Sequence, residues 1–181
     1  MSKLLMFSGG VESTALLGMM NPVNDYVGII DVHSPLDAPD HDLVRQWKIL
    51  SYYGFQNVCV CTLKITRTNN QVVGDTSSQY QPFADLMVAR MPNIDQLWWG
   101  CHAGDTHDDE KWTRYRKAFS IIHPQCQVIQ PLEKLTKREQ WNMIDDEVKP
   151  FVVSCYDHHP DIVDNCKLCK DRSLIYKGSD S

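Results

Sequence analysis

The strongest constraint on the fold is the alternation of short apolar runs with helical segments along the chain. Apolar runs lie at 3–7, 26–32, 57–63, 96–100 and 127–130, and helical spacing at 13–20, 41–53, 83–89, 109–122 and 136–144. Strands that alternate with helices build a parallel sheet covered on both faces. We therefore expect an α/β, Rossmann-like sheet of about five strands with helices on both faces, and a polar loop at 64–79.

Composition narrows the classes of protein that this chain can be. Its 181 residues suit one domain, and no stretch approaches the roughly 20 apolar residues of a membrane span. The formal charge of −5 argues against a nucleic-acid partner, which needs a basic face. Seven cysteines without a secretion signal argue against a disulfide framework. We expect a cytoplasmic protein with no membrane partner.

A glycine loop at residues 8–14 follows the first expected strand. It reads Ser8-Gly9-Gly10-Val11-Glu12-Ser13-Thr14, with two glycines for a sharp turn and three hydroxyl side chains. The helix expected from about Ser13 would direct amide donors and its positive end into this loop. The spaced Gly-Lys-Ser/Thr of the other familiar phosphate loop is absent from the sequence. The loop predicts a pyrophosphate site, although a tight turn with a serine cap has the same pattern.

Further candidates follow other expected strands, because ligands bind beyond the carboxyl ends of parallel strands. Asp31, Asp105 and Lys137 hold such positions. Lys137 would be a cation at the phosphates, and a solvated helix lysine is the alternative. Asp105 would orient the amine of a substrate or a magnesium ion, and Asp31 would contact ribose or substrate, with a turn or cap role as its alternative. Cys101 is either a nucleophile or a small buried residue.

A cysteine cluster marks the C-terminal part of the chain. Cys166-x-x-Cys169 has the spacing that lets two thiolates hold one ion, and Cys155 is a third ligand. Imidazole is the favoured fourth ligand by its chemistry, and we assign it to His159. The alternatives for the fourth position are His158, Asp157, Asp161 and Asp164. We expect structural Zn²⁺ in a segment at 150–181 that packs on a nucleotide domain at 1–149.

The glycine loop resembles the Ser-Gly-Gly-x-Asp-Ser signature of the PP-loop ATP pyrophosphatases, with Glu12 where the signature has Asp. Three further motifs resemble elements of the 7-cyano-7-deazaguanine (preQ0) synthase family. They are Ser154-Cys155-Tyr156, Cys166-x-x-Cys169-x-x-Arg172, and Pro131-Leu132 before Thr136-Lys137. Val163 stands where that family has a further zinc cysteine. Tyr80-Gln81-Pro82-Phe83-Ala84-Asp85 lacks the glycine and arginine of a family element in the pocket region, and Asp85 replaces its asparagine.

The resemblance implies an adenine nucleotide alpha hydrolase-like fold and a ligase of queuosine biosynthesis. Such an enzyme uses ATP and Mg²⁺ to adenylate 7-carboxy-7-deazaguanine and converts it with ammonia to the amide and the nitrile. Ser8, Ser13, Lys137 and Asp105 would be catalytic, and residues 8–14 with Asp31 would bind the nucleotide. The resemblance also suggests a homodimer. The alternatives are another PP-loop adenylating enzyme, such as a different amide ligase or a tRNA sulfur transferase using Cys101, and a zinc-bearing binding module without catalysis.

Overall fold

The computed structural model describes residues 1–33, 41–64, 77–91, 93–101, 103 and 109–152. The strands are β1 (Ser2–Phe7), β2 (Tyr26–His33), β3 (Val58–Lys64), β4 (Ile94–Trp98) and β5 (Gln127–Ile129). The helices are α1 (Val11–Leu17), α2 (His41–Tyr53), α3 (Ser77–Arg90), α4 (Asp109–Ile122) and α5 (Lys137–Asn142), with a 3₁₀ turn η1 (Lys149–Phe151). The five strands are all parallel, in the order β3-β2-β1-β4-β5.

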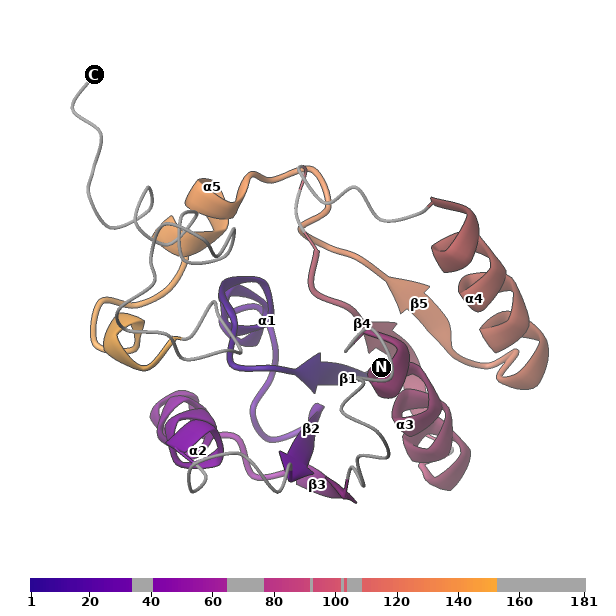
Figure 1. Cartoon of the computed structure of the whole chain (residues 1–181), viewed down its shortest axis with the longest axis horizontal. Coiled ribbons are helices and arrows are strands. Elements are labelled where there is room, and N and C mark those ends of the chain that lie inside the picture. Colours follow the sequence, from indigo (N-terminus) through magenta and orange to yellow (C-terminus); the bar gives the residue numbers. More distant parts are fainter. Residues whose placement is uncertain (34–40, 65–76, 92, 102, 104–108, 153–181) are drawn as a thin grey trace, which may run out of the picture.

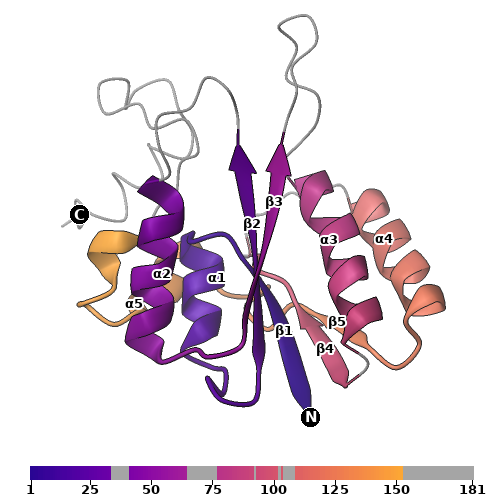
Figure 2. The same cartoon turned by 90° about the horizontal axis from the view of Figure 1, so that it is seen from below.

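Helices cover both faces of this sheet, as Figure 2 shows, so the expected α/β architecture is confirmed. One core cluster joins β1 and β2 to α1, α2, α5 and η1, and contains Phe7, Leu16, Ile49, Trp141 and Val152. The second joins β1 and β4 to α3 and α4, and contains Leu4, Met87, Leu97 and Phe119. Buried strands that pack on two faces read as continuous apolar runs, which is the pattern of the first strand. Because Val152 is 1% exposed, the first cluster extends past the boundary expected at 149/150.

Two helices begin earlier than the sequence pattern indicated. Helix α1 starts at Val11 and not near Ser13, so Ser13 is the third helical residue and Gly10 is the N-cap. Helix α3 starts at Ser77, six residues before the expected start at 83, and continues through Pro82. Proline lacks an N–H and usually ends or begins a helix, which is why the polar stretch before it resembled a loop.

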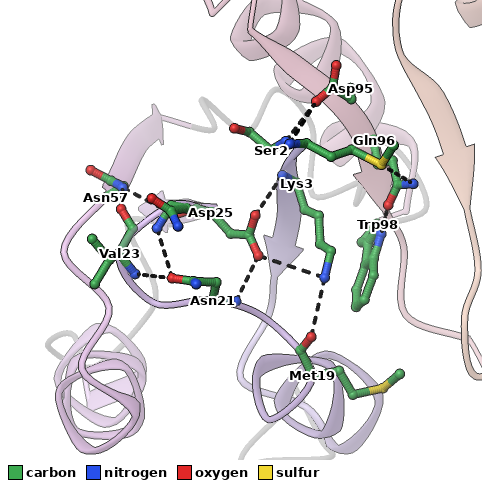
Figure 3. A network of polar contacts seen from close by, with 12 residues as sticks. Ser2, Lys3, Met19, Asn21, Val23, Asp25, Asn57, Asp95, Gln96 and Trp98 are labelled. Atoms are coloured by element: carbon green, nitrogen blue, oxygen red, sulfur yellow. Dashed lines mark hydrogen bonds and ion pairs between the residues drawn. The ribbon is translucent and has the colours of Figure 1, made fainter.

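The amino ends of the strands are joined by a polar network around Asp25, shown in Figure 3. The Asp25 carboxylate accepts hydrogen bonds from the backbone N–H of Lys3 at 2.9 Å and of Asn21 at 2.8 Å. The Lys3 Nζ lies 3.9 Å from the same carboxylate, which is 2% exposed. A buried carboxylate needs such partners. Asp25 therefore ties β1 to the α1–β2 turn, at the edge of the sheet opposite the glycine loop.

The described residues contain no helix long and apolar enough to cross a membrane.

Candidate nucleotide site

The glycine loop lies at the point where the strand order of the sheet reverses. β1 is the central strand, with β2 and β3 on one side and β4 and β5 on the other. The loop leaves the carboxyl end of β1 and enters α1 (Figure 1). Open α/β sheets bind ligands at this kind of switch point, because the flanking connections run to opposite faces and leave a crevice.

Two hydroxyl groups organise the glycine loop. The Oγ atoms of Ser8 and Ser13 lie 3.1 Å apart, and the Ser8 N–H donates to Ser13 Oγ at 3.3 Å. The Gly10 N–H donates to Ser8 Oγ, and Ser13 Oγ donates to the Gly10 carbonyl, both at 3.3 Å. These bonds are long for their type, and hydroxyls can rotate toward a ligand. The structure thus brings the two predicted catalytic serines together on one small loop.

Gly9 needs to be glycine for two reasons. Its φ is +77°, a conformation that side chains disfavour. A Cβ on Gly9 would also lie 3.1 Å from Cγ of Gln46 in α2. The Gln46 amide donates to the Ser8 carbonyl at 3.0 Å, and Gln46 is 8% exposed. Helix α2 therefore packs against the glycine loop through Gln46, a contact that the sequence pattern did not predict.

Gly100 allows a second close approach to the loop. A Cβ at this position would lie 3.0 Å from Glu12 Cβ and 3.2 Å from the backbone nitrogen of Ser13. The residue follows β4, so the absence of a side chain lets the end of that strand contact the first turn of α1. The sequence pattern placed Gly100 at the end of an expected strand but did not predict its contact with the loop. The available signal was a glycine immediately after a buried strand, which often marks a close backbone approach.

Lys137 reaches the glycine loop from α5. Its Nζ lies 3.1 Å from Glu12 Oε1, and the two side chains are 13% and 21% exposed. Lys137 is the first residue of α5, whose N-cap Thr136 forms a capping box with Glu139. A cation at a helix N-terminus is electrostatically unfavourable. Pairing with Glu12 offsets that cost and leaves a positive group beside the predicted phosphate site.

Gln140 joins the connections that follow β4 and β5. Its side-chain amide donates to the carbonyl of Cys101 at 2.7 Å and to that of Leu132 at 3.0 Å, and it is fully buried. The Ala103 N–H also donates to the Leu135 carbonyl at 2.9 Å. Buried carbonyls need donors, so one glutamine fixes two loops at the ligand edge of the sheet. Sequence reasoning missed this residue because its partner Cys101 lies 39 positions away along the chain.

Two predicted binding residues of the loop face the interior. Val11 and Thr14 are 0% exposed, and the Thr14 hydroxyl has no hydrogen-bond partner in the structure. In this arrangement Val11 and Thr14 can contact a ligand only through their backbone atoms. Gly10 caps α1 with no side-chain hydrogen bond, and the first amides of a helix have no intrahelical acceptor. These amides suit an anion.

Several predicted site residues lie outside what the structure describes. Asp105 and the predicted zinc ligands Cys155, His159, Cys166 and Cys169 are among them. The backbone of Asp31 is described in β2, in register with Thr62 of β3 near the carboxyl end. Within the described residues, no three His, Cys, Asp or Glu side chains come together to hold a metal ion.

Cys101 is buried, whereas the Asp85 side chain is 34% exposed. Cys101 is 3% exposed. Asp85 lies in α3, where its Oδ1 is 3.5 Å from His123 Nε2. Burial raises the pKa of the Asp85 carboxyl, and the nearby His123 acts in the opposite direction. Asp85, expected near the pocket, therefore has a partner in the α3–α4 packing.

Aromatic rings gather beside the carboxyl end of β4. Trp99 lies next to Trp112 of α4 with ring centroids 5.2 Å apart, and Trp112 contacts Tyr115 at 5.4 Å. The Trp112 Nε1–H donates to Gln130 Oε1 at 2.8 Å, which fixes the ring against the residue after β5. Trp99 directly precedes Gly100, so this ring cluster lies next to the residue that approaches the glycine loop.

Comparison with known proteins finds no matching family model and no matching curated protein sequence. Solved structures do match. The U34-tRNA thiolase NcsA from Methanococcus maripaludis, solved with its [4Fe-4S] cluster, aligns at a TM-score of 0.56 and 16% identity over 97% of this chain. A 4-thiouridine synthetase in complex with RNA and bound ATP aligns at 0.50 and 16% over 83% of this chain. The chain spans 65% and 40% of these proteins, and it shares their α/β fold.

Proposed function

We propose that this protein is a PP-loop enzyme that splits ATP into AMP and pyrophosphate to activate a carboxylic acid. The observation that carries the proposal is the meeting of Ser8, Ser13 and Lys137 at the switch point of the sheet. Hydroxyls, helix amides and a lysine are the donors that hold phosphate oxygens in proteins. The 4-thiouridine synthetase, which shares the fold, was solved with bound ATP, which supports a nucleotide as the ligand of this chain.

The proposed substrate is 7-carboxy-7-deazaguanine, with ammonia as the amine. Its carboxylate would attack the α-phosphorus of ATP, which forms an acyl adenylate and releases pyrophosphate. Ammonia would then displace AMP and leave the amide. A second adenylation, on the amide oxygen, would let the nitrile form as AMP departs. The support for this substrate is the resemblance of the glycine loop and the C-terminal cysteine segment to the preQ0 synthases.

The residues of the chain would act by positioning and by charge. Ser8, Ser13 and the amides of α1 would hold the pyrophosphate, and Lys137 would stabilise the charge that develops on it. Magnesium bound to the phosphates would neutralise further charge. Glu12, the carboxylate of the loop, is already paired with Lys137. Asp105 would orient the amine, and the C-terminal thiolates with His159 would bind structural zinc.

A second candidate is sulfur transfer to tRNA. One structural neighbour is a U34-tRNA thiolase and another is a 4-thiouridine synthetase in complex with RNA. In this chain Cys101 follows Gly100 directly after β4. That reaction needs an accessible thiol, whereas the Cys101 side chain is buried in this structure. The net charge of −5 also disfavours an RNA face. We therefore favour the small-molecule ligase.

The test is product analysis by mass spectrometry with ATP, magnesium, ammonium and 7-carboxy-7-deazaguanine. We expect the amide or the nitrile, with loss of product in a Ser13→Ala variant. A parallel reaction would contain unmodified tRNA, a sulfur donor and a Cys101→Ser variant. Thiolated tRNA that depends on Cys101, with no amide or nitrile, would replace the ligase with the sulfur transferase. Absence of ATP binding would remove both enzyme candidates.

A further inference from the structure

An exposed apolar groove runs along the outer face of α2. It has a volume of about 610 Å³ and is lined mainly by Val44, Trp47, Ser51, Tyr52 and Phe151. Val44 is 55% exposed, Trp47 41% and Tyr52 49%. Exposed apolar side chains are common singly, but a contiguous set in a hollow marks an interaction site. The groove lies on the helix face opposite to Gln46, Ile49 and Leu50, which are buried in the domain.

One wall of this groove is formed by the chain just before the C-terminal segment. Tyr52 OH lies 3.4 Å from Glu147 Oε2, and Lys48 Nζ lies 5.0 Å from the ring of Phe151. Glu147 thus lies beside Tyr52, and Phe151, four residues later in the chain, lies beside Lys48, four residues earlier in α2. The chain runs antiparallel to α2, and Glu147 and Phe151 line the C-terminal half of the groove.

The same direction leads to the N-terminal half of the groove, which includes Val44. Val152 has extended backbone, with φ −75° and ψ 128°. An extended chain advances about 3.3 Å per residue, while one α-helical turn from Lys48 to Val44 rises about 6 Å. Two or three further residues would therefore reach Val44. The next residues are Val153, Ser154, Cys155 and Tyr156, of which Val153 is apolar and Tyr156 is a large aromatic residue.

We propose that the N-terminal half of the α2 groove is the docking site for the C-terminal segment of this same chain, beginning with Val153 and Tyr156. An occupant tethered beside the groove has a high effective concentration and needs no second molecule. The 29 residues after Val152 also carry further apolar side chains, at Ile162, Val163, Leu168, Leu174 and Ile175. This docking is independent of the proposed enzymatic reaction.

Photo-cross-linking of the full chain tests the proposal. The amino acid p-benzoylphenylalanine would replace Val44, an exposed position that leaves the core intact. Ser51 would carry the same group as a positive control, because residues 147–151 already line that end of the groove. Ile121, which is 73% exposed on α4, would carry it as the negative control. Circular dichroism would verify that each variant keeps its fold.

Irradiation of a mixture of ¹⁴N- and ¹⁵N-labelled chains distinguishes the occupants. The proposal predicts cross-links from position 44 to peptides within 153–181 of the same chain, at least five times more abundant than those from position 121. Mixed-isotope cross-links from position 44 would assign the groove to a second copy and overturn the proposal. Cross-links at position 44 no more abundant than at position 121 would overturn it as well.

Discussion

Lys137 Nζ lies 3.1 Å from Glu12 Oε1, so the first residue of α5 is joined to the loop between β1 and α1. The two residues are far apart in the chain and meet only because α1 packs against α5 on one face of the sheet. Glu12 stands where the PP-loop signature that this loop resembles has aspartate, and its carboxylate makes this contact. The pair keeps a cation beside the predicted phosphate site before nucleotide binds.

Removing Lys137 should weaken the binding of ATP, which carries phosphates, more than the binding of adenosine, which carries none. Lys137→Ala should lower the affinity for ATP by roughly 10–100-fold, because a charge-assisted contact contributes about 1.5–3 kcal/mol. The affinity for adenosine should change little. Lys134→Ala, at an exposed position three residues earlier, is the matched control and should bind ATP as the wild type does. Equal losses for ATP and adenosine, measured by calorimetry, would show that Lys137 does not contact the phosphates.

Filling the space at Gly100 should damage the glycine loop. Gly100→Ala places a Cβ 3.0 Å from Glu12 Cβ and 3.2 Å from the Ser13 nitrogen, so either the loop or the end of β4 must move. We expect a loss of about 1–3 kcal/mol in the free energy of unfolding, with weaker ATP binding. Gly18→Ala is the control, because its φ is −62° and its nearest contact is 3.6 Å away. A Gly100→Ala protein with wild-type stability and ATP affinity would contradict the close approach.

Gln140 should matter for stability because its buried side chain joins the connections that follow β4 and β5. Gln140→Met keeps the volume but removes the side-chain donor of the Cys101 and Leu132 carbonyls, of which the Leu132 carbonyl keeps the Leu135 N–H. A buried polar group that loses its partner costs about 1–3 kcal/mol, so we expect a loss of about that size in urea denaturation. Gln125→Met, at an exposed position, should leave the midpoint unchanged. Similar urea midpoints for the two variants would show that the hydrogen bonds of Gln140 do not stabilise the fold.

Asp85 should make stability depend on pH. Burial raises the pKa of its carboxyl in the folded protein. A raised folded pKa favours the folded state below the unfolded value near 4, and that stability is lost as pH rises through the folded pKa. Asp85→Asn mimics the neutral carboxyl and should raise Tm at pH 7, with a gain that shrinks toward pH 4. A variant less stable than the wild type at pH 7 would mean that attraction to His123 outweighs burial.

Local pattern was enough to predict the sheet. The apolar run before Ser8 and the glycines after it identify the central strand and its ligand edge, since both signals lie within one short segment. The first turns of α3, before Pro82, were not predicted, because a proline that follows polar residues is typical of a loop. Helix α1 was placed two residues late for a similar reason, since glycines at 9 and 10 conceal where helical backbone begins.

The contacts that support the site were not predictable in the same way. Gln46 contacts Ser8, 38 positions away, Gln140 contacts Cys101, 39 positions away, and Gly100 approaches Glu12, 88 positions away. Their residue types are unremarkable in sequence, and only the packing of α2, β4 and α5 around the glycine loop gives them a role. The predicted zinc ligands and Asp105 stay predictions.

The nucleotide products of ATP turnover test the central claim most directly. Chromatography of a reaction with ATP, magnesium, ammonium and 7-carboxy-7-deazaguanine would separate AMP from ADP, and a coupled assay would measure pyrophosphate. The account predicts AMP and pyrophosphate in equal amounts, with a loss of at least 100-fold in Ser13→Ala. Formation of ADP and phosphate, or AMP formation that is unaffected by Ser13→Ala, would contradict cleavage at the glycine loop.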